Sequence, residues 1–519
     1  MDTISPLLSF SPRKFCPSPA SIIRFFRYGN DESLFVIGSP NEESVMVFRY
    51  SAAGDQPQLE EVSELPDHKY GVSDIAVNCV GTVIVTSGLD STVRVWKRSR
   101  QGKYEHYRNI PAVGGKTIDI GDIDQIAILT REAGRYNVLV SVGSAGGKIH
   151  FTDLATDASS ESTAAVRGGK RPARRLIPPV DCLYRGAKKT YLGCVTAMHL
   201  SPDGSYLAYG TSSGYVGLAR LICEVEDNNL RLECDLRGVL RCFKSAVASP
   251  VRSLAMHGNT LLVGGEANVG RIVALDMLRV SGYLVDDSGE KSNSSGTKSR
   301  KTSNPAVLGS IPLNYSSRLR SILISEAPGL QPANFLLSFV SSDGTVQTHV
   351  LPDGPDAAWA DGGEPETVNQ LDLRNKGAQK LTHVTICAAA TAALKSSKDS
   401  QWSDCVAVAL ANGKMEIYKI RQCVAPKMPE LPIEVEGGVF DMFKSAASQH
   451  RQLNVGEDWN QDINRHYQEG PPTTGVTASS HSDAAGHQEN NDVVMTDDTP
   501  AAAAQPPPLI TSTQPVSGS

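Results

Sequence analysis

Gly71-Val-Ser-Asp-Ile-Ala-Val-Asn-Cys-Val-Gly-Thr-Val-Ile-Val-Thr-Ser-Gly-Leu-Asp-Ser-Thr-Val-Arg-Val-Trp96 is the most regular segment of this 519-residue chain. Apolar residues alternate along residues 72–77 and again along 92–96, and a third apolar run covers 82–87. The pattern predicts three antiparallel strands. Because so small a sheet leaves its edges and faces open, it is stable only beside similar sheets. One such unit therefore predicts further units elsewhere in the chain.

The end of this unit, a tight turn followed by alternating apolar residues, recurs along the chain. The seven segments that share it end at Phe48, Trp96, Phe151, Ala219, Leu275, His349 and Tyr418. Five of the seven carry glycine at the turn, where a backbone with positive φ is easiest. A short apolar strand precedes each segment, so the sequence predicts seven similar units.

Four residues in and beside the first unit form a second pattern. His68, Thr86, Asp90 and Trp96 match the buried hydrogen-bond set of the WD-repeat family, one repeat of which the whole segment resembles. In that set Asp accepts from His, His bonds to Ser or Thr, and Trp supplies its indole N–H. Each bond contributes about 1 kcal/mol net, and a stranded buried partner costs more. Catalytic triads use similar residue types, but the family match favours a structural role.

The resemblance implies an all-β fold, a seven-bladed WD-repeat β-propeller over residues 1–421. A compact WD repeat has about 40–45 residues, whereas successive segment ends here lie between 48 and 74 residues apart. The excess is expected in loop insertions rich in small, polar or charged residues, at 155–175, 286–304, 353–366 and 389–403. A strand within residues 4–10 is placed to complete the last blade and close the ring.

The repeat pattern stops after residue 421. Residues 422–469 form an extension, in which residues 439–452 could form a short helix with apolar side chains on one side. From 470 to 519, Pro, Ala, Ser, Thr, Gln and Asp dominate, so this segment cannot bury enough apolar surface to offset its ordering entropy. The acidic, Pro- and Ala-rich tail is therefore expected to be disordered.

The negative charge is concentrated near the C-terminus. Of the formal net charge of −6, residues 453–519 hold nine acidic side chains against one arginine, which leaves +2 on the rest of the chain. A nearly neutral body gives no general argument for nucleic-acid binding, which needs clustered Lys and Arg. Proteins are the expected partners, with no direct nucleic-acid contact and no membrane contact.

The cysteine pattern and the hydropathy indicate which kinds of protein this chain is not. The ten cysteines include no Cys-x-x-Cys pair, which argues against a disulfide framework and against a zinc site. The N-terminus lacks a basic region before a long apolar stretch, and no apolar run is long enough to span a membrane. We expect an intracellular protein with no catalytic residues, no cofactor and no metal.

Two other motifs carry alternative interpretations. Lys170, Arg171, Arg174 and Arg175 form the strongest basic cluster, which is typical of a nuclear-import signal or an RNA contact but also of a solvated loop. Gly210-Thr-Ser-Ser-Gly214 fits the hydrolase pattern Gly-x-Ser-x-Gly, with Ser212 as the nucleophile. That pattern needs a strand entering a helix, whereas strands flank it here, so a hairpin turn is favoured.

Within the WD repeats, the chain resembles the small WD-repeat subunit of the superkiller complex, a family also found with the RNA polymerase II-associated factor (PAF) complex. The resemblance rests on residues 71–76 and 87–96, on Lys116-Thr-Ile-Asp-Ile-Gly-Asp-Ile-Asp124 and on Ser249-Pro-Val-Arg-Ser-Leu254. It covers roughly residues 4–420. The long insertions, the tail and the degenerate blades depart from the family pattern.

The resemblance implies a non-catalytic scaffold, with the propeller monomeric within a hetero-complex, in nucleus and cytoplasm. Its implied partners are a tetratricopeptide-repeat subunit and an RNA helicase, in exosome-dependent 3'-5' mRNA decay or in transcription elongation. One alternative is a WD-repeat adaptor of another assembly, such as a ubiquitin-ligase substrate receptor. A second alternative is a hydrolase housed on a propeller.

Overall fold

The protein is described by a computed structural model. The described residues are 6–12, 18–29, 32–52, 57–111, 123–143, 147–154, 178–182, 184–185, 190–226, 229–243, 249–266, 271–280, 307–312, 319–325, 335–351, 367–373, 375–376, 379–380, 384–395 and 402–423. The chain divides into two units, Met1–Gly438 and Val439–Ser519, and all described residues belong to the first.

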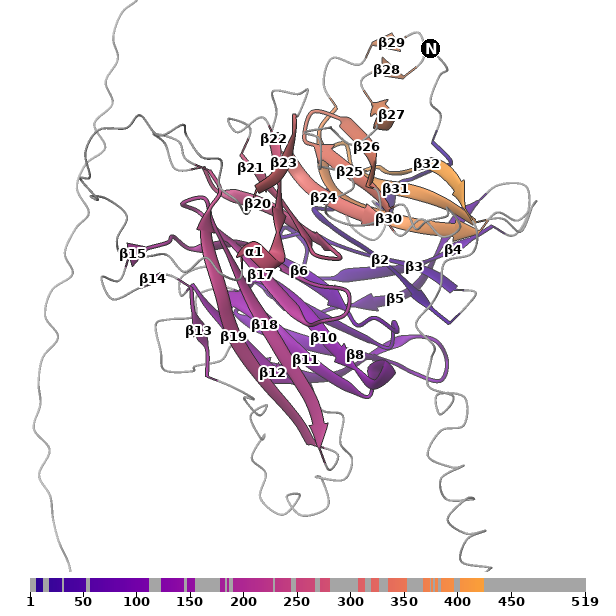
Figure 1. Ribbon diagram of the computed structural model, residues 1–519. Coiled ribbons are helices and arrows are strands. Elements are labelled where there is room, and N and C mark those ends of the chain that lie inside the picture. The colour runs from indigo at the N-terminus through magenta and orange to yellow at the C-terminus, as the bar shows by residue number, and fades with distance from the viewer. Residues whose placement is uncertain are drawn as a thin grey trace, which may run out of the picture. The chain divides into compact units, whose positions relative to one another are not determined.

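The first unit is a seven-bladed β-propeller made of four-stranded antiparallel sheets, as the sequence predicts (Figure 1). Blades 1 to 3 contain β2 (Ile22–Tyr28), β3 (Glu32–Gly38), β4 (Val45–Ser51), β5 (Gln58–Leu65), β6 (Val72–Val77), β7 (Val83–Gly88), β8 (Thr92–Arg98), β9 (Tyr104–Pro111), β10 (Ile123–Arg131), β11 (Tyr136–Gly143), β12 (Lys148–Asp153) and β13 (Val180–Asp181). Blades 4 and 5 contain β16 (Val195–Leu200), β17 (Tyr206–Thr211), β18 (Tyr215–Glu226), β19 (Asn229–Arg241), β20 (Val251–His257), β21 (Thr260–Gly265), β22 (Arg271–Asp276) and β23 (Val307–Pro312).

Blades 6 and 7 contain β24 (Leu319–Ser325), β25 (Phe335–Ser341), β26 (Thr345–Leu351), β27 (Thr367–Asp372), β30 (Ile386–Lys395), β31 (Trp402–Leu410), β32 (Met415–Cys423) and β1 (Leu8–Phe10). The remaining described elements are β14 (Tyr184–Arg185), β15 (Thr190–Tyr191), β28 (Asn375–Lys376), β29 (Gln379–Lys380), the 3-10 turn η3 (Glu132–Gly134) and the four-residue helix α1 (Met277–Val280). No helix within the described ranges is long and apolar enough to cross a membrane.

The first strand of each of the seven sheets faces the centre of the ring. These strands contact one another in the order β2, β6, β10, β16, β20, β24 and β30, and β30 returns to β2. Middle strands such as β7 are buried along their whole length because neighbouring blades cover both of their faces. Outer strands such as β5 alternate buried and exposed residues because they meet solvent. Apolar clusters between successive blades form the core.

The ring is closed by the N-terminal strand, as the sequence predicts for residues 4–10. β1 pairs antiparallel with β32, placing Leu8 opposite Ile417 and Phe10 opposite Met415. Phe10 also meets Phe48 of blade 1 edge to face, with ring centroids 5.1 Å apart. Blade 7 therefore combines strands from both ends of the described chain.

Other blades fill the space that Trp96 occupies in blade 2 with different side chains. In blade 4, Ala219 stands at the Trp96 position, and Tyr209 opposite Met198 occupies the space, which requires glycine at position 217 because a Cβ there would lie 2.0 Å from the Tyr209 ring. In blade 6, His349 packs on Phe339 with ring centroids 5.4 Å apart. In both blades, a large side chain on the second strand thus helps to fill the volume that Trp96 fills in blade 2.

Blade 3 departs from the predicted pattern at two points. The register of β12 is offset by one residue, since Val142 pairs with Ile149 whereas Ser87 pairs with Val93 in blade 2. Phe151 therefore packs toward blade 4, and Thr152 takes the Trp96 position. Its outer strand β13 pairs with β12 at two positions only. Pro178 and Pro179 precede it, and since proline has no N–H to donate, the ladder does not extend past them.

The predicted loop insertion at 389–403 is wrong over most of its length. Residues 389–395 belong to β30 and residues 402–403 to β31. Their small side chains suggested a loop, but Ala390 and Ala392 pack between blades 7 and 1, where little space separates the sheets. The predicted insertions at 155–175, 286–304 and 353–366, the helix at 439–452 and the tail at 470–519 lie outside the described residues.

Candidate interaction site

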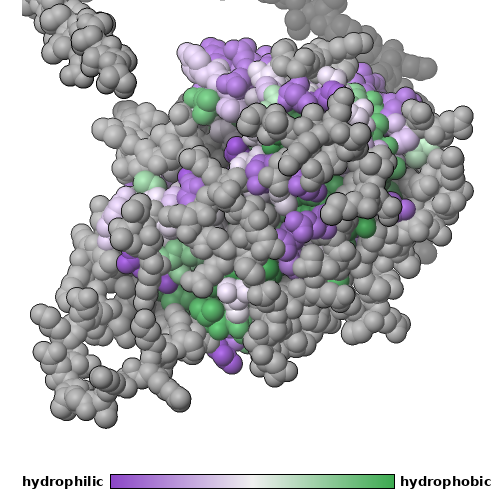
Figure 2. All heavy atoms as spheres, turned by 90° about the horizontal axis from the view of Figure 1, so that it is seen from above, coloured by the Kyte–Doolittle hydropathy of each residue, from purple (hydrophilic) through white to green (hydrophobic). Residues whose placement is uncertain are grey.

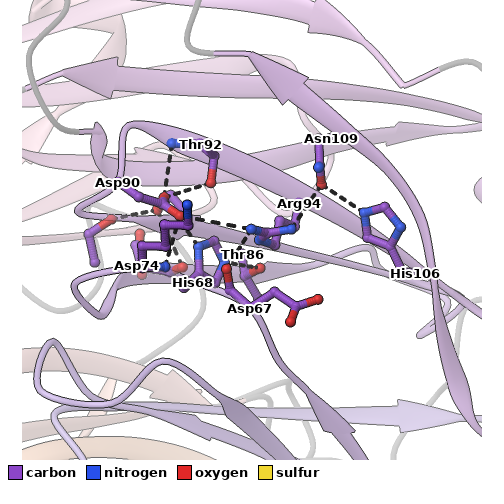
Figure 3. Close-up of polar contacts among 12 residues, drawn as sticks. Asp67, His68, Asp74, Thr86, Asp90, Thr92, Arg94, His106 and Asn109 are labelled. Atoms are coloured by element: carbon purple, nitrogen blue, oxygen red, sulfur yellow. Dashed lines mark hydrogen bonds and ion pairs between the residues drawn. The ribbon is translucent and has the colours of Figure 1, made fainter.

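Four side chains predicted from the sequence meet inside blade 2. The hydroxyl Oγ1 of Thr86, on β7, lies 2.7 Å from His68 Nε2 and 3.0 Å from Trp96 Nε1 on β8. His68 Nδ1 lies 3.5 Å from Asp90 Oδ1 in the β7–β8 turn, a long contact (Figure 3). A glycine at position 88 leaves room for the set, because a Cβ there would lie 2.3 Å from His68 Nδ1.

One protonation pattern satisfies this set of hydrogen bonds. The Trp96 indole N–H donates to Thr86, so the Thr86 hydroxyl is free to donate to His68 Nε2. His68 then carries its proton on Nδ1, facing Asp90. Burial lowers the pKa of His68, although the Asp90 carboxylate opposes this, and so His68 is neutral at physiological pH. His68 and Thr86 have no exposed surface, so a substrate could not reach them.

Asp90 also holds the start of β8. Its carboxylate accepts hydrogen bonds from the Thr92 hydroxyl at 2.6 Å and from the backbone N–H groups of Thr92 and Lys69 at 3.1 and 3.0 Å. Burial acts to raise the pKa of Asp90, but these hydrogen bonds outweigh it and lower the pKa below its usual value. Asp90 therefore stays ionised and joins the turn to the preceding loop.

That loop, residues 66–71, connects β5 of blade 1 to β6 of blade 2 and is named the Tyr70 loop below. The His68 N–H donates to the Glu43 carbonyl of blade 1 at 3.0 Å, and the Gly71 carbonyl accepts from Leu89 N–H of blade 2 at 3.0 Å. Only glycine fits position 71, because φ is +101° and a Cβ would lie 1.9 Å from the Pro40 carbonyl oxygen. The loop is thus held by the turns of two blades.

The Tyr70 loop presents an aromatic side chain on strained backbone. Tyr70 has φ +71° and Asp67 has φ +81°, a left-handed region that bulky residues adopt at a cost of about 1–3 kcal/mol. Tyr70 is 75% exposed, the most exposed of the large hydrophobic side chains in the described part of the chain. The buried hydrogen bonds of His68 therefore stabilise a loop conformation that projects Tyr70 into solvent.

Arg94 extends the polar network along blade 2. Its guanidinium donates to the Asp67 carbonyl at 2.5 Å and to Asn109 Oδ1 at 3.3 Å, and it lies 3.9 Å from the Asp90 carboxylate (Figure 3). His106 also contacts Asn109, at 2.7 Å, and packs edge to face on Trp96. Arg94 thus connects the Tyr70 loop with the outer strand of the blade.

A second network, not foreseen from the sequence, joins the inner strands of blades 1 to 3. Arg24 of β2 donates to the Asp74 carboxylate of β6 at 2.7 Å and to the Ile75 carbonyl at 3.1 Å. Asp74 in turn accepts the Ile126 N–H of β10 at 3.0 Å. Burial raises the pKa of Asp74, while Arg24 opposes this shift.

Similar side-chain bonds continue from blade 3 to blade 6. Gln125 donates to the Thr196 carbonyl at 2.7 Å, and the Thr196 hydroxyl donates to the Val251 carbonyl at 2.6 Å. The hydroxyl of Ser253 accepts the Ile322 N–H at 2.9 Å. Each polar residue that makes these bonds is the second or third residue of its inner strand, but no motif marks these positions in the sequence. These bonds fix the inner strands of blades 1 to 6 to one another.

The structure describes one of the two other motifs found in the sequence, the Gly-x-Ser-x-Gly match, but not the basic cluster. Ser212 lies in the β17–β18 hairpin, and its hydroxyl accepts the Cys194 N–H at 3.1 Å, so the Gly-x-Ser-x-Gly match is a turn between strands. The basic cluster Lys170, Arg171, Arg174 and Arg175 lies outside the described residues.

A comparison with family models matches residues 59–97 to the family described as WD domain, G-beta repeat. No curated protein sequence matches the chain. Among solved structures, a chain in the crystal structure of the mitotic checkpoint complex is 11% identical with a TM-score of 0.48, covering 81% of this chain and 93% of that chain.

Sqt1 of Chaetomium thermophilum, bound to the N-terminus of ribosomal protein L10, is 15% identical with a TM-score of 0.47, covering 77% of this chain and 83% of that chain.

Within this chain, the family match begins in β5 of blade 1 and ends in β8 of blade 2, so the sequence repeat is offset by one strand from the blade. The protein is therefore a seven-bladed β-propeller that carries a WD repeat over residues 59–97.

Proposed function

We propose that the protein is a non-catalytic scaffold subunit that binds other proteins, with the Tyr70 loop in its contact surface. The observation that carries this proposal is the exposed Tyr70 on a strained backbone that buried hydrogen bonds hold in place. A preorganised aromatic side chain loses little entropy on binding and is a common anchor of protein interfaces. The strain is then part of the recognition surface.

The propeller suits this role because a rigid ring displays loops from several blades. On the face seen from above in Figure 2, apolar side chains of the described residues form separate patches between hydrophilic ones.

The test is quantitative affinity purification of the full chain from mildly lysed cells. Tyr70→Ala is expected to reduce recovery of bound proteins about tenfold or more, since central aromatic anchors contribute about 2 kcal/mol or more. Tyr107→Ala on outer strand β9 removes a less exposed tyrosine, 36% against 75%, and serves as the matched control. Equal recovery with both variants would remove the Tyr70 loop from the interface.

For the identity of the complex, we propose a superkiller-like assembly that assists exosome-dependent mRNA decay, a PAF-like elongation assembly, or both. The support is the sequence resemblance over residues 71–76, 87–96, 116–124 and 249–254. A tetratricopeptide-repeat protein and an RNA helicase are then expected to co-purify with the chain, as one propeller in a hetero-complex. Recovery of ubiquitin-ligase subunits instead would favour the substrate-receptor alternative.

Such assemblies act in nucleus and cytoplasm, and we propose both locations for this protein. The basic cluster Lys170, Arg171, Arg174 and Arg175 is the proposed import signal. Changing all four residues to alanine is expected to shift a fluorescently tagged chain from nucleus to cytoplasm. An unchanged distribution would contradict this role.

A further inference from the structure

Strands β18 and β19 form a hairpin that is longer than the other outer hairpins. β18 has 12 residues and β19 has 13, whereas the adjacent strand β17 has six. The hairpin therefore continues past the end of β17 and projects from the blade (Figure 1). Among the described residues, β18 is the only strand paired with β19, so the far side of β19 is a sheet edge.

The two faces of this projecting hairpin differ. Leu221 and Leu232 on one face are buried in the cluster that includes Leu129 and Val138 of blade 3. On the opposite face, Arg231 and Glu233 have 60% and 51% of their side chains exposed and form an ion pair at 2.7 Å. The hairpin is thus anchored on blade 3 through one face and presents charges on the other.

The register of the hairpin shows which backbone groups point outward. Glu226 and Asn229 form the last pair of the hairpin, so their N–H and C=O groups bond to each other, and alternate residues of β19 do the same with β18. The N–H and C=O groups of Leu230, Leu232 and Cys234 then point away from β18. The Leu221 N–H agrees with this alternation, because it donates to Ser205 on the β17 side.

We propose that this edge pairs with β19 of a second copy of the chain, antiparallel and centred on Leu232. Leu232 then faces the second copy's Leu232, and Leu230 faces its Cys234, with the outward groups of all three residues hydrogen-bonded. Arg231 faces the second copy's Glu233 in a non-hydrogen-bonded pair, where side chains of opposite strands lie closest. A continuous sheet of two hairpins results.

The charges on β19 select this register. Moving the centre by one residue places Arg231 opposite itself or Glu233 opposite itself, and moving it to Cys234 places Glu233 opposite Asp235. Each of these arrangements opposes like charges, which destabilises a sheet. Past Asp235 the strand carries a bulge, since Leu218 pairs with Gly238 and Ala219 with Leu236. Within β19, the projecting part is therefore the regular, self-complementary edge.

This contact does not involve the Tyr70 loop, and it adds a second copy to the single propeller expected from the sequence. It goes beyond the proposed scaffold function. A scaffold of this kind would present two copies of each interaction loop, and loss of pairing would leave the binding of other proteins through Tyr70 intact.

The test is sedimentation equilibrium of the full chain up to roughly 100 µM, where contacts of modest affinity are populated. The wild type is expected to show a monomer–dimer equilibrium. Arg231→Glu and Glu233→Arg are each expected to weaken self-association about tenfold or more, because each places like charges opposite one another twice per dimer. An equimolar mixture of the two variants is expected to restore pairing, because positions 231 and 233 are then both acidic in one chain and both basic in the other.

Arg100→Glu, an exposed site in the β8–β9 turn, changes the net charge as Arg231→Glu does and serves as the control. Circular dichroism identifies any variant that fails to fold, and heterodimer formation itself requires both variants to be folded. A wild-type chain that stays monomeric throughout overturns the proposal. Equal dimerisation of all variants, or no restoration on mixing, overturns it as well.

Discussion

His199 on β16 makes the stability of the propeller depend on pH. Burial lowers the pKa of His199 to about 4, whereas the unfolded chain has the usual value of 6.5. Below about pH 6.5 the unfolded state therefore binds more protons, and the free energy of unfolding falls as the pH falls. Urea titrations are expected to show a loss of about 2 kcal/mol from this residue between about pH 7.5 and pH 5.

His199→Gln is expected to remove that part of the pH dependence because glutamine does not titrate in this range. His68 contributes in the same direction, since its pKa is also lowered, so some dependence remains. His106→Gln replaces an exposed histidine and is the matched control. A His199→Gln protein with the wild-type pH dependence would show that His199 is equally easy to protonate in the folded state.

The hydrogen bonds around Thr86 are expected to act as one unit. Thr86→Val keeps the shape of the side chain but leaves His68 Nε2 and the Trp96 indole N–H without their partner. Stranding buried groups in this way is expected to lower the free energy of unfolding by about 2–4 kcal/mol in urea titrations. Trp96→Phe should cost less in the Thr86→Val background than in the wild type, and strictly additive effects would exclude such coupling.

At the scale of the elements, the contact between β2, β6 and β10 depends more on Asp74 than on Arg24. Asp74→Ala removes the acceptor for both Arg24 and the Ile126 N–H, whereas Arg24→Ala removes a side chain that is 45% exposed. We expect Asp74→Ala to lower the free energy of unfolding by about 2–3 kcal/mol and Arg24→Ala by about 1 kcal/mol. Thermal and urea unfolding of the two variants would measure both losses. A larger loss for Arg24→Ala than for Asp74→Ala would contradict this prediction.

The sequence predicts elements well where one strand pattern repeats. All seven predicted segment ends lie in the third strands of their sheets, because alternation and turn glycines are local properties. The shortened β13 and the β30 strand are harder to predict. Two prolines stop the first, and the alanine-rich sequence of the second resembles a loop until blade 1 packs against it.

The candidate site can be predicted from the sequence only in part, because some of its contacts join residues of different blades. His68, Thr86, Asp90 and Trp96 follow a known spacing, so their meeting could be expected. The role of Tyr70 depends on its φ of +71° and on contacts of its neighbours with two blades, which no local pattern encodes. The bonds between the inner strands likewise depend on which strands become neighbours in the ring.

At the scale of the whole molecule, the ring depends on a short closing strand. β1 contributes three residues to blade 7, and Phe10 packs on Phe48 of blade 1. Deletion of residues 1–10 is expected to lower the midpoint of thermal unfolding by about 5 °C or more, because it exposes the edge of β32 and opens the contact between blades 7 and 1. Phe10→Ala should have a smaller effect in calorimetry, and an unchanged midpoint after the deletion would mean that closure does not depend on β1.

The pairing of β1 with β32 also has a consequence for synthesis on the ribosome. Leu8 leaves the ribosome more than 400 residues before its partner Ile417. At about 5–20 residues per second, the first strand waits roughly 20–80 s for the strand that it pairs with. During that time blades 1 to 6 can assemble, but the ring cannot close. A nascent chain cut short before β32 keeps an unpaired N-terminal segment, which chaperones and proteases could recognise as a mark of incomplete translation.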